Sequence, residues 1–273
     1  MVSGSRLSIT PCHTRDCGCV CRKLAQAFKV ATIIRRIAAL SVAHSTAGFD
    51  SPTTSATVKA VLGGIRRSLG TAQTCKAPTI TADIRAMTSM LPLDKLIGVR
   101  DRAILLIGFS GALRRSEIVA LDTADLSFTT DGLILTIRRS KGDQEGEGAK
   151  LGIPFGSDPG TCPVRSLQAW LDAAGITSGA VFKSINRHNT VSTHRLRSEA
   201  IAEVVKRAVA ATGRDSSNYA GHSLRAGLAT SAAMAGVEER VIATQTRHKS
   251  LVVRRYIRTG SLFRDNASAR VGL

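Results

Sequence analysis

The chain has 273 residues with 38 lysines and arginines against 20 acidic residues, which gives a formal net charge of +18 and a pI near 10.7. Such a charge attracts polyanions at low salt, and nucleic-acid-binding proteins of many kinds share it. A hydrophobic content of 43% excludes a disordered basic tail, and the length suits one folded domain plus a smaller one. The sequence contains no signal-peptide core and no apolar run of about 18 residues, which argues against a membrane partner.

Residues 1–23 show no helical period, yet they hold most of the cysteines of the chain. These are Cys12, Cys17, Cys19 and Cys21, with His13 nearby. A structural zinc site usually has its cysteines paired as C-x₂-C, whereas these form C-x-C-x-C, so we expect no bound metal. We predict an atypical, disordered segment left by an N-terminal truncation or a reading-frame scar. Cys75 and Cys162 have no obvious partner, which is typical of a reduced, cytoplasmic setting.

Two amphipathic helices are predicted between residues 24 and 69, each with an apolar stripe beside a pair of arginines. The stripes run through Ile33, Ile34, Ile37 and Leu40, and through Val58, Val61, Leu62 and Ile65. Glycine and proline punctuate the loop 43–55 between them, and residues 70–78 are expected to form a linker to the next domain.

Beyond the linker, an apolar helix is predicted from about residue 101 to Gly111, and a second helix begins after it with Arg114, Arg115, Ser116 and Glu117. Residues 132–155 then alternate in character around a polar turn, which predicts a β-hairpin with strands 133–139 and 150–155. Lys141 lies at the start of that turn. Lys150 on the partner strand is an alternative candidate, and a loop lysine is more often only a solvated charge. A further helix is expected around Trp170.

Three helices are predicted near the end of the chain, over about 223–235, 237–246 and from about 250 onward. His222 and Arg225 are three residues apart, so a helix places both side chains on one face, where they can converge on one phosphate. Guanidinium groups stabilise the negative charge that gathers on a phosphodiester under attack. His248 lies at the break before the last helix, and Tyr256 lies about two turns into it.

Taken together, these segments resemble the tyrosine recombinases, also called the phage integrase family. GALRRSE (111–117) resembles the first arginine box, with Arg114 as its arginine and Arg115 at the variable position, and HSLR (222–225) resembles the H-x-x-R box. His248 stands where the family has its second histidine or tryptophan. Tyr256 stands where it has its nucleophile. Two departures are Thr246-Arg247-His248, where Leu-Gly-His is frequent, and Gly142 after the lysine, where Thr is common.

The resemblance implies a mainly α fold with a small antiparallel β-hairpin or sheet. A catalytic domain over residues 76–273 would follow a partial helical, SAM-like core-binding domain over residues 24–75. It also implies double-stranded DNA as partner and a homotetrameric synapse, in which residues 257–273 could form a terminal helix that docks on a neighbouring subunit. An ordinary surface helix is an alternative for that segment.

The implied activity is site-specific recombination through a 3′-phosphotyrosyl intermediate, without metal, cofactor or ATP. Arg114 and Arg225 would hold the scissile phosphate, His222 would accept the proton of the Tyr256 hydroxyl, and two further residues would assist. These are His248, as a hydrogen-bond donor to a non-bridging oxygen, and Lys141, as the acid that protonates the leaving 5′ oxygen.

Each motif by itself also has a structural explanation, such as a helix cap, a core histidine or a packed tyrosine, and only their combination in one order favours catalysis. Tyr219 is the one other tyrosine and therefore the alternative nucleophile. Two alternative functions remain open: a type IB topoisomerase, which shares the chemistry, and a DNA-binding remnant without activity.

Overall fold

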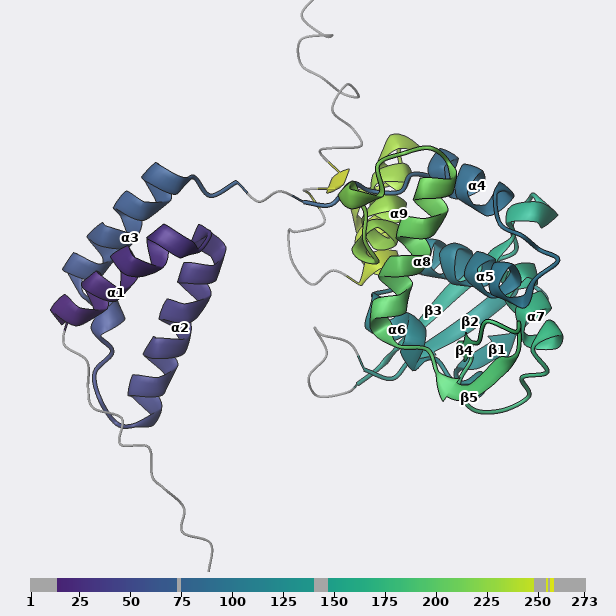
Figure 1. The fold of residues 1–273 in the computed structure, drawn as a ribbon, viewed down its shortest axis with the longest axis horizontal. Coiled ribbons are helices and arrows are strands. Elements are labelled where there is room, and N and C mark those ends of the chain that lie inside the picture. Colours follow the sequence, from purple (N-terminus) through teal and green to yellow (C-terminus); the bar gives the residue numbers. More distant parts are fainter. Residues whose placement is uncertain (1–13, 73–74, 140–146, 248–253, 255, 258–273) are drawn as a thin grey trace, which may run out of the picture. The chain divides into compact units, whose positions relative to one another are not determined.

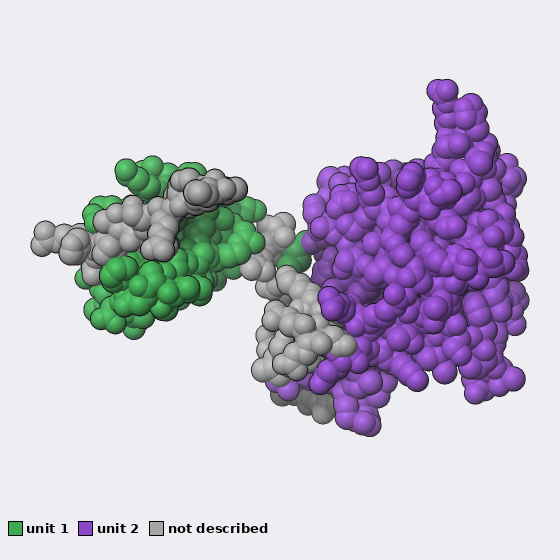
Figure 2. All heavy atoms as spheres, turned by 90° about the horizontal axis from the view of Figure 1, so that it is seen from below, with its two compact units in different colours: residues 1–75 green, residues 76–273 purple. Residues whose placement is uncertain are grey.

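The computed structural model describes residues 14–72, 75–139, 147–247, 254 and 256–257. Contacts divide the chain into two compact units, Met1–Cys75 and Lys76–Leu273 (Figure 2). Most of the described residues in both units are helical, and the strands form small antiparallel sheets, so the predicted fold class is confirmed (Figure 1). None of the helices described is both long and apolar enough to cross a membrane.

The first unit consists of three helices around a small core. They are α1 (Thr14–Ala27), α2 (Val30–Thr46) and α3 (Ala56–Leu69), with the one-turn helix η1 (Pro52–Thr54) between the last two. Its buried side chains are Cys17, Cys21, Val30, Ile33, Ile37, Val58 and Ile65. Ile34 was expected in this core but is 39% exposed, because Ile33 and Ile37 lie one turn apart on the inner face and Ile34 points away from it.

Helix α1 corrects the sequence interpretation, which expected no helix before residue 24. Cys17 and Cys21 are four residues apart and fully buried, and Leu24 and Phe28 continue the same stripe against the core. The period is therefore helical, with cysteine acting as a small apolar side chain. Cys12 and His13 lie outside the described residues.

The second unit surrounds the buried helix α5 (Leu96–Ser110), whose residues Ala103–Ile107 are almost completely inaccessible to solvent. The other helices are α4 (Thr81–Ser89), α6 (Arg115–Ala120), α7 (Pro163–Ala173), α8 (Ser198–Ala211), α9 (His222–Met234) and α10 (Glu239–Thr246), with one-turn helices η2 (Thr123–Asp125), η3 (Pro159–Thr161) and η4 (Ser216–Asn218). In α7, Trp170 is fully buried and its Nε1 donates a 2.8 Å hydrogen bond to the Val181 carbonyl.

Two antiparallel sheets complete this unit, where the sequence predicted only one hairpin. The predicted hairpin is present as β2 (Gly132–Ile137) and β3 (Ala149–Pro154), and β1 (Leu126–Phe128) extends it to three strands. A second sheet pairs β4 (Lys183–Ile185) with β5 (Val191–Arg195). These two strands are short and half-buried or exposed, so their sequence lacks the apolar alternation that signals a strand.

Close backbone contacts fix the position of α9, on which two of the candidate residues lie. A Cβ atom at Gly227 would come within 1.9 Å of the Thr79 carbonyl oxygen, so only glycine permits this approach. Thr79 in turn donates to the Ser223 carbonyl from its backbone nitrogen (3.1 Å) and from Oγ1 (3.0 Å). Gly108 of α5 similarly admits Leu224, whose Cδ1 lies 2.7 Å from the Cβ position. The start of α9 is therefore packed directly against α5.

Candidate active site

The first contact of the candidate site joins His222 to Tyr256. His222 is the first residue of α9, and its Nε2 lies 2.7 Å from the Tyr256 hydroxyl oxygen in a hydrogen bond that spans 34 residues of sequence. The two rings are 6.1 Å apart between centroids and tilted by 55°. Tyr256 is half-buried and packs with Ile257 against an apolar cluster formed by α9 and α10. The hydroxyl therefore has a fixed neighbour that can exchange a proton with it.

Arg225 lies one turn further along α9 and is only 1% exposed. Its Nη1 donates a 2.7 Å hydrogen bond to the Ala112 carbonyl, and its buried Nη2 finds no hydrogen-bond acceptor within the described part of the chain. Burial lowers the pKa of Arg225 to about 10, and the positive charges of Arg114 and Arg247 contribute to this shift. A buried guanidinium with an unused donor next to other cations is suited to binding an anion.

Arg114 is the residue that caps α6 at its N-terminus, and it is anchored by Glu117. The Arg114 backbone nitrogen donates to Glu117 Oε2 (2.9 Å) and its Nη1 to Glu117 Oε1 (2.5 Å). The Glu117 carboxylate is buried, whereas Arg115 points to solvent. Of the two arginines at this turn, Arg114 is the one whose charge acts on Arg225.

Burial and the charges of Arg225 and Arg114 affect the pKa of His222. Partial burial of its ring lowers the pKa of His222 below its usual value of 6.5, and the charges of Arg225 and Arg114 lower it further. The ring is thus neutral at pH 7 and can accept a proton. Four of the six predicted residues, Arg114, His222, Arg225 and Tyr256, are brought together in this way.

Arg247 is a member of this cluster that sequence reasoning missed. It ends α10 and its guanidinium donates to Glu117 Oε2 at 2.7 Å. Burial lowers the pKa of Arg247, Arg114 lowers it further, and Glu117 opposes both. The departure from Leu-Gly-His at this position was the available signal, but nothing in the sequence indicated that the side chain would turn inward.

Two predicted residues, Lys141 and His248, lie outside the described residues, as does the proposed terminal helix beyond residue 257. The two alternatives are described. Lys150 is exposed on β3, opposite Thr136. Tyr219 follows η4 and packs against the main core. Its hydroxyl interacts with Arg214.

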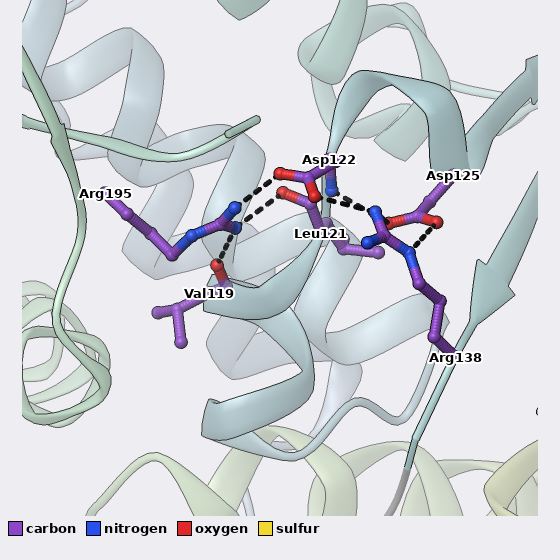
Figure 3. Close-up of polar contacts among 6 residues, drawn as sticks. All are labelled: Val119, Leu121, Asp122, Asp125, Arg138 and Arg195. Atoms are coloured by element: carbon purple, nitrogen blue, oxygen red, sulfur yellow. Dashed lines mark hydrogen bonds and ion pairs between the residues drawn. The ribbon is translucent and has the colours of Figure 1, made fainter. Parts of the chain in front are cut away.

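The end of β2 is held by a network of two arginines and two aspartates (Figure 3). Arg138, which follows β2, donates to Asp125 from Nε and Nη2 and to Asp122 from Nη2, each at 2.7 Å. Arg195 of β5 binds Asp122 from the other side and also donates to the carbonyls of Val119 (2.6 Å) and Leu121 (3.1 Å). The network connects both sheets.

Replacing Arg138 should weaken the fold in a pH-dependent way. Arg195 makes the largest contribution, and Arg138 the second largest, to lowering the pKa of Asp122 below 3.8. These two ion pairs therefore stabilise the folded protein above pH 3.8, and the stabilisation is lost as the pH falls through the lowered pKa of Asp122. Asp125 is buried and would keep the hydrogen bond from the Asp122 backbone nitrogen but lose both bonds from Arg138. We expect Arg138→Gln to lower the thermal midpoint at pH 7 by about 2–4 °C, and the difference from the unmodified protein to shrink as the pH falls through the lowered pKa of Asp122.

Thermal unfolding followed by circular dichroism at several pH values measures this difference. Arg139→Gln is the matched control, because it removes the same charge from the neighbouring exposed residue. A midpoint difference that Arg139→Gln reproduces, or one that is constant from pH 7 to pH 3, would show that Asp122 and Asp125 are not the relevant partners.

Comparison with known proteins identifies relatives of this chain. Residues 82–260 match the Phage integrase family. The chain is 40% identical over 252 residues to the "Integrase/recombinase xerD homolog" of Selenomonas ruminantium, a match that covers 91% of this chain and 74% of that protein.

Solved structures show the same fold at low sequence identity. The XerH site-specific recombinase bound to palindromic difH substrate has a TM-score of 0.65 at 16% identity, covering 97% of this chain and 72% of that one. The Tn1549 transposon integrase in complex with transposon right end DNA has a TM-score of 0.63 at 16% identity, covering 98% and 87%. With the family match and the 40% identical relative, these similarities establish that the chain belongs to the phage integrase family, the DNA strand transferases known as tyrosine recombinases.

Proposed function

We propose that this protein performs site-specific recombination by cutting and rejoining double-stranded DNA through a 3′-phosphotyrosyl intermediate. The observation that carries the proposal is the 2.7 Å hydrogen bond between Tyr256 and His222, beside the buried guanidinium of Arg225. The nucleophile Tyr256 lies 34 residues further along the chain, and it meets the proton acceptor His222 and the cation Arg225 at the first turn of α9.

In the proposed reaction, the Tyr256 oxygen attacks the phosphorus and its proton passes to His222 Nε2. Arg225 and Arg114 neutralise the charge that develops on the non-bridging oxygens, in the role that Mg²⁺ has in other phosphoryl transfers. The bond from phosphorus to the 5′ oxygen breaks, and Lys141 protonates the leaving oxygen while His248 donates to a non-bridging oxygen. Because the phosphodiester is exchanged for a phosphotyrosyl ester, a 5′ hydroxyl can reverse the step without ATP.

The DNA-bound state of relatives supports a nucleic-acid partner for this chain. XerH and the Tn1549 integrase were solved in complex with DNA, and the net charge of +18 favours the same partner here. In the first unit, α2 and α3 carry exposed arginine pairs at Arg35, Arg36, Arg66 and Arg67. We propose that this unit is the core-binding domain, that Lys76–Leu273 is the catalytic domain, and that four protomers assemble on DNA.

A nicked suicide substrate tests the proposal. Cleavage near the nick releases a short 5′-hydroxyl fragment, so religation is prevented and a covalent complex accumulates, visible as a shifted band on a denaturing gel. We expect protein attached to the 3′ end, in equal yield with and without EDTA. Salt-sensitive DNA binding without any adduct would instead select the inactive DNA-binding alternative. Rejoining of the same strand only, without exchange between duplexes, would select the topoisomerase.

The pH dependence of the cleavage rate should reflect the protonation state of His222. If the neutral ring accepts the Tyr256 proton, single-turnover cleavage is lost as the pH falls through the lowered pKa of His222, so the acid limb should have its midpoint below 6.5. Rates measured from pH 5 to pH 8 at DNA concentrations well below saturation test this, because they report the protein before DNA binds, with His222→Gln as the variant expected to lack the limb. An acid limb with its midpoint above 6.5, or one that persists in His222→Gln, would assign the proton to another group.

A further inference from the structure

The backbone of Arg247 is in a conformation that its side chain disfavours. Arg247 ends α10 with φ 52° and ψ 44°, in the left-handed region. This position at the end of a helix is usually glycine, and an L-residue with a side chain loses about 1 kcal/mol there. Because Arg247 adopts this conformation in the folded protein, other interactions offset that loss, and its side-chain contacts are the ones at hand.

Those contacts reach the turn that positions the other two arginines. Arg247 is 13% exposed, and its guanidinium donates to the carbonyls of Gly111 (3.2 Å) and Ala112 (3.4 Å) and to the Glu117 carboxylate (2.7 Å). The Ala112 carbonyl is the same one that accepts from Arg225. Ala112 itself has φ 45°, so the backbone of this turn is strained. The Ala112 carbonyl accepts hydrogen bonds from two guanidinium groups, those of Arg225 and Arg247.

The charge balance of the cluster also depends on Arg247. One buried carboxylate, Glu117, binds both Arg114 and Arg247, and Arg225 is the third cation. With three guanidinium groups and one carboxylate, the cluster has a surplus of two positive charges. Without Arg247, Glu117 would be opposed at contact distance only by Arg114 and would neutralise the charge that Arg114 presents to a phosphate.

We propose that Arg247 is a positioning residue, which binds Glu117 and the turn at Gly111 and Ala112 so that Arg114 and Arg225 keep their orientation and net positive charge toward a bound phosphate. This inference rests on the proposed function, since it assigns a role to Arg247 in binding the scissile phosphate. It differs from the family pattern, in which a glycine is frequent at this position and supplies no charge.

Arg247→Gly is the most informative variant, because glycine removes the side chain and suits the left-handed backbone. We expect the single-turnover rate of cleavage at saturating DNA to fall about 10- to 100-fold, while DNA affinity changes less than about threefold. Arg247→Lys should recover part of the rate because it keeps the charge. Arg254→Gln is the charge-matched control. It removes an exposed arginine that pairs with exposed Glu239, and its rate should stay within about twofold of the unmodified protein.

A double variant separates the charge effect from a loss of packing. Glu117→Gln keeps an oxygen that can accept from the Arg114 backbone but removes the negative charge. If Arg247 acts by balancing Glu117, the double variant Arg247→Gly/Glu117→Gln should cleave about tenfold faster than Arg247→Gly. An Arg247→Gly variant that cleaves at the unmodified rate, or a double variant that gains nothing, would overturn the inference.

Inorganic phosphate provides a readout that does not require DNA cleavage. Phosphate added at constant ionic strength against chloride should raise the thermal midpoint of the unmodified protein, and raise that of Arg247→Gly less. If the protein forms no adduct but this phosphate effect depends on Arg247, the proposed function fails and the inference stands. If the adduct forms normally in Arg247→Gly and the phosphate effect is unchanged, the inference fails and the function stands.

Discussion

Tyr256→Phe should abolish the covalent complex with DNA. The substitution removes only the hydroxyl oxygen, the atom that lies 2.7 Å from His222 Nε2, and leaves the ring that packs against α9 and α10. Without a nucleophile the adduct cannot form, so we expect its yield on a suicide substrate to fall by a factor on the order of 10⁴ or more, to the detection limit. Affinity for the intact site, measured by gel shift at fixed salt, should change little.

Tyr219→Phe is the matched control, because it makes the same chemical change at the only other tyrosine. Tyr219 packs against the main core and its hydroxyl interacts with Arg214, so its loss should leave the adduct yield almost unchanged. An adduct that persists in Tyr256→Phe and disappears in Tyr219→Phe would reverse the assignment of the nucleophile. An adduct that persists in the double variant Tyr219→Phe/Tyr256→Phe would exclude the tyrosine mechanism.

Arg225→Gln should lower the rate of cleavage by about 10²- to 10³-fold, as expected when one donor to a developing oxyanion is removed. The same change should not lower stability. Burial and the neighbouring cations disfavour the charge of Arg225, and its Nη2 is a buried donor without an acceptor in the part of the chain that the structure describes. Removing the charge therefore relieves repulsion between cations, and this gain compensates for the lost hydrogen bond to the Ala112 carbonyl. Thermal unfolding and single-turnover cleavage of the same preparation measure the two effects.

Arg100→Gln is the control for this prediction, because Arg100 is also a buried arginine but is paired. It donates from Nε and Nη2 to the buried carboxylate of Asp101. Arg207 also pairs with Asp101, so the carboxylate would keep one partner, and the loss of the Arg100 bonds should cost about 2 kcal/mol of stability without a specific loss of cleavage by the protein that remains folded. If Arg225→Gln destabilises as much as Arg100→Gln, or if its cleavage rate is normal, then Arg225 is a structural residue and not a ligand of the phosphate.

Local sequence patterns predicted part of the second unit. The helix that begins beside His222 was expected at 223–235 and is observed at 222–234, and the hairpin strands differ from their predicted bounds by one or two residues. These elements have a clear apolar period, so burial and local propensity agree. Strands β4 and β5 have no such period and were missed, and α1 was misjudged because cysteines form part of its inner face. Helices α4 and α8 were not predicted individually either, although α8 has an apolar period.

By itself, the sequence determined which residues could form the candidate site, because the spacing of His222 and Arg225 along one helix and the presence of only two tyrosines are properties of the chain. Only the tertiary structure decided that Arg225 and Arg247 share the Ala112 carbonyl and that Glu117 binds both Arg114 and Arg247. Such contacts depend on how α5, α6, α9 and α10 pack, and that packing brings together residues more than 100 positions apart in the chain. No periodicity within one helix carries that information, since Arg225 and Arg247 contact groups on other elements.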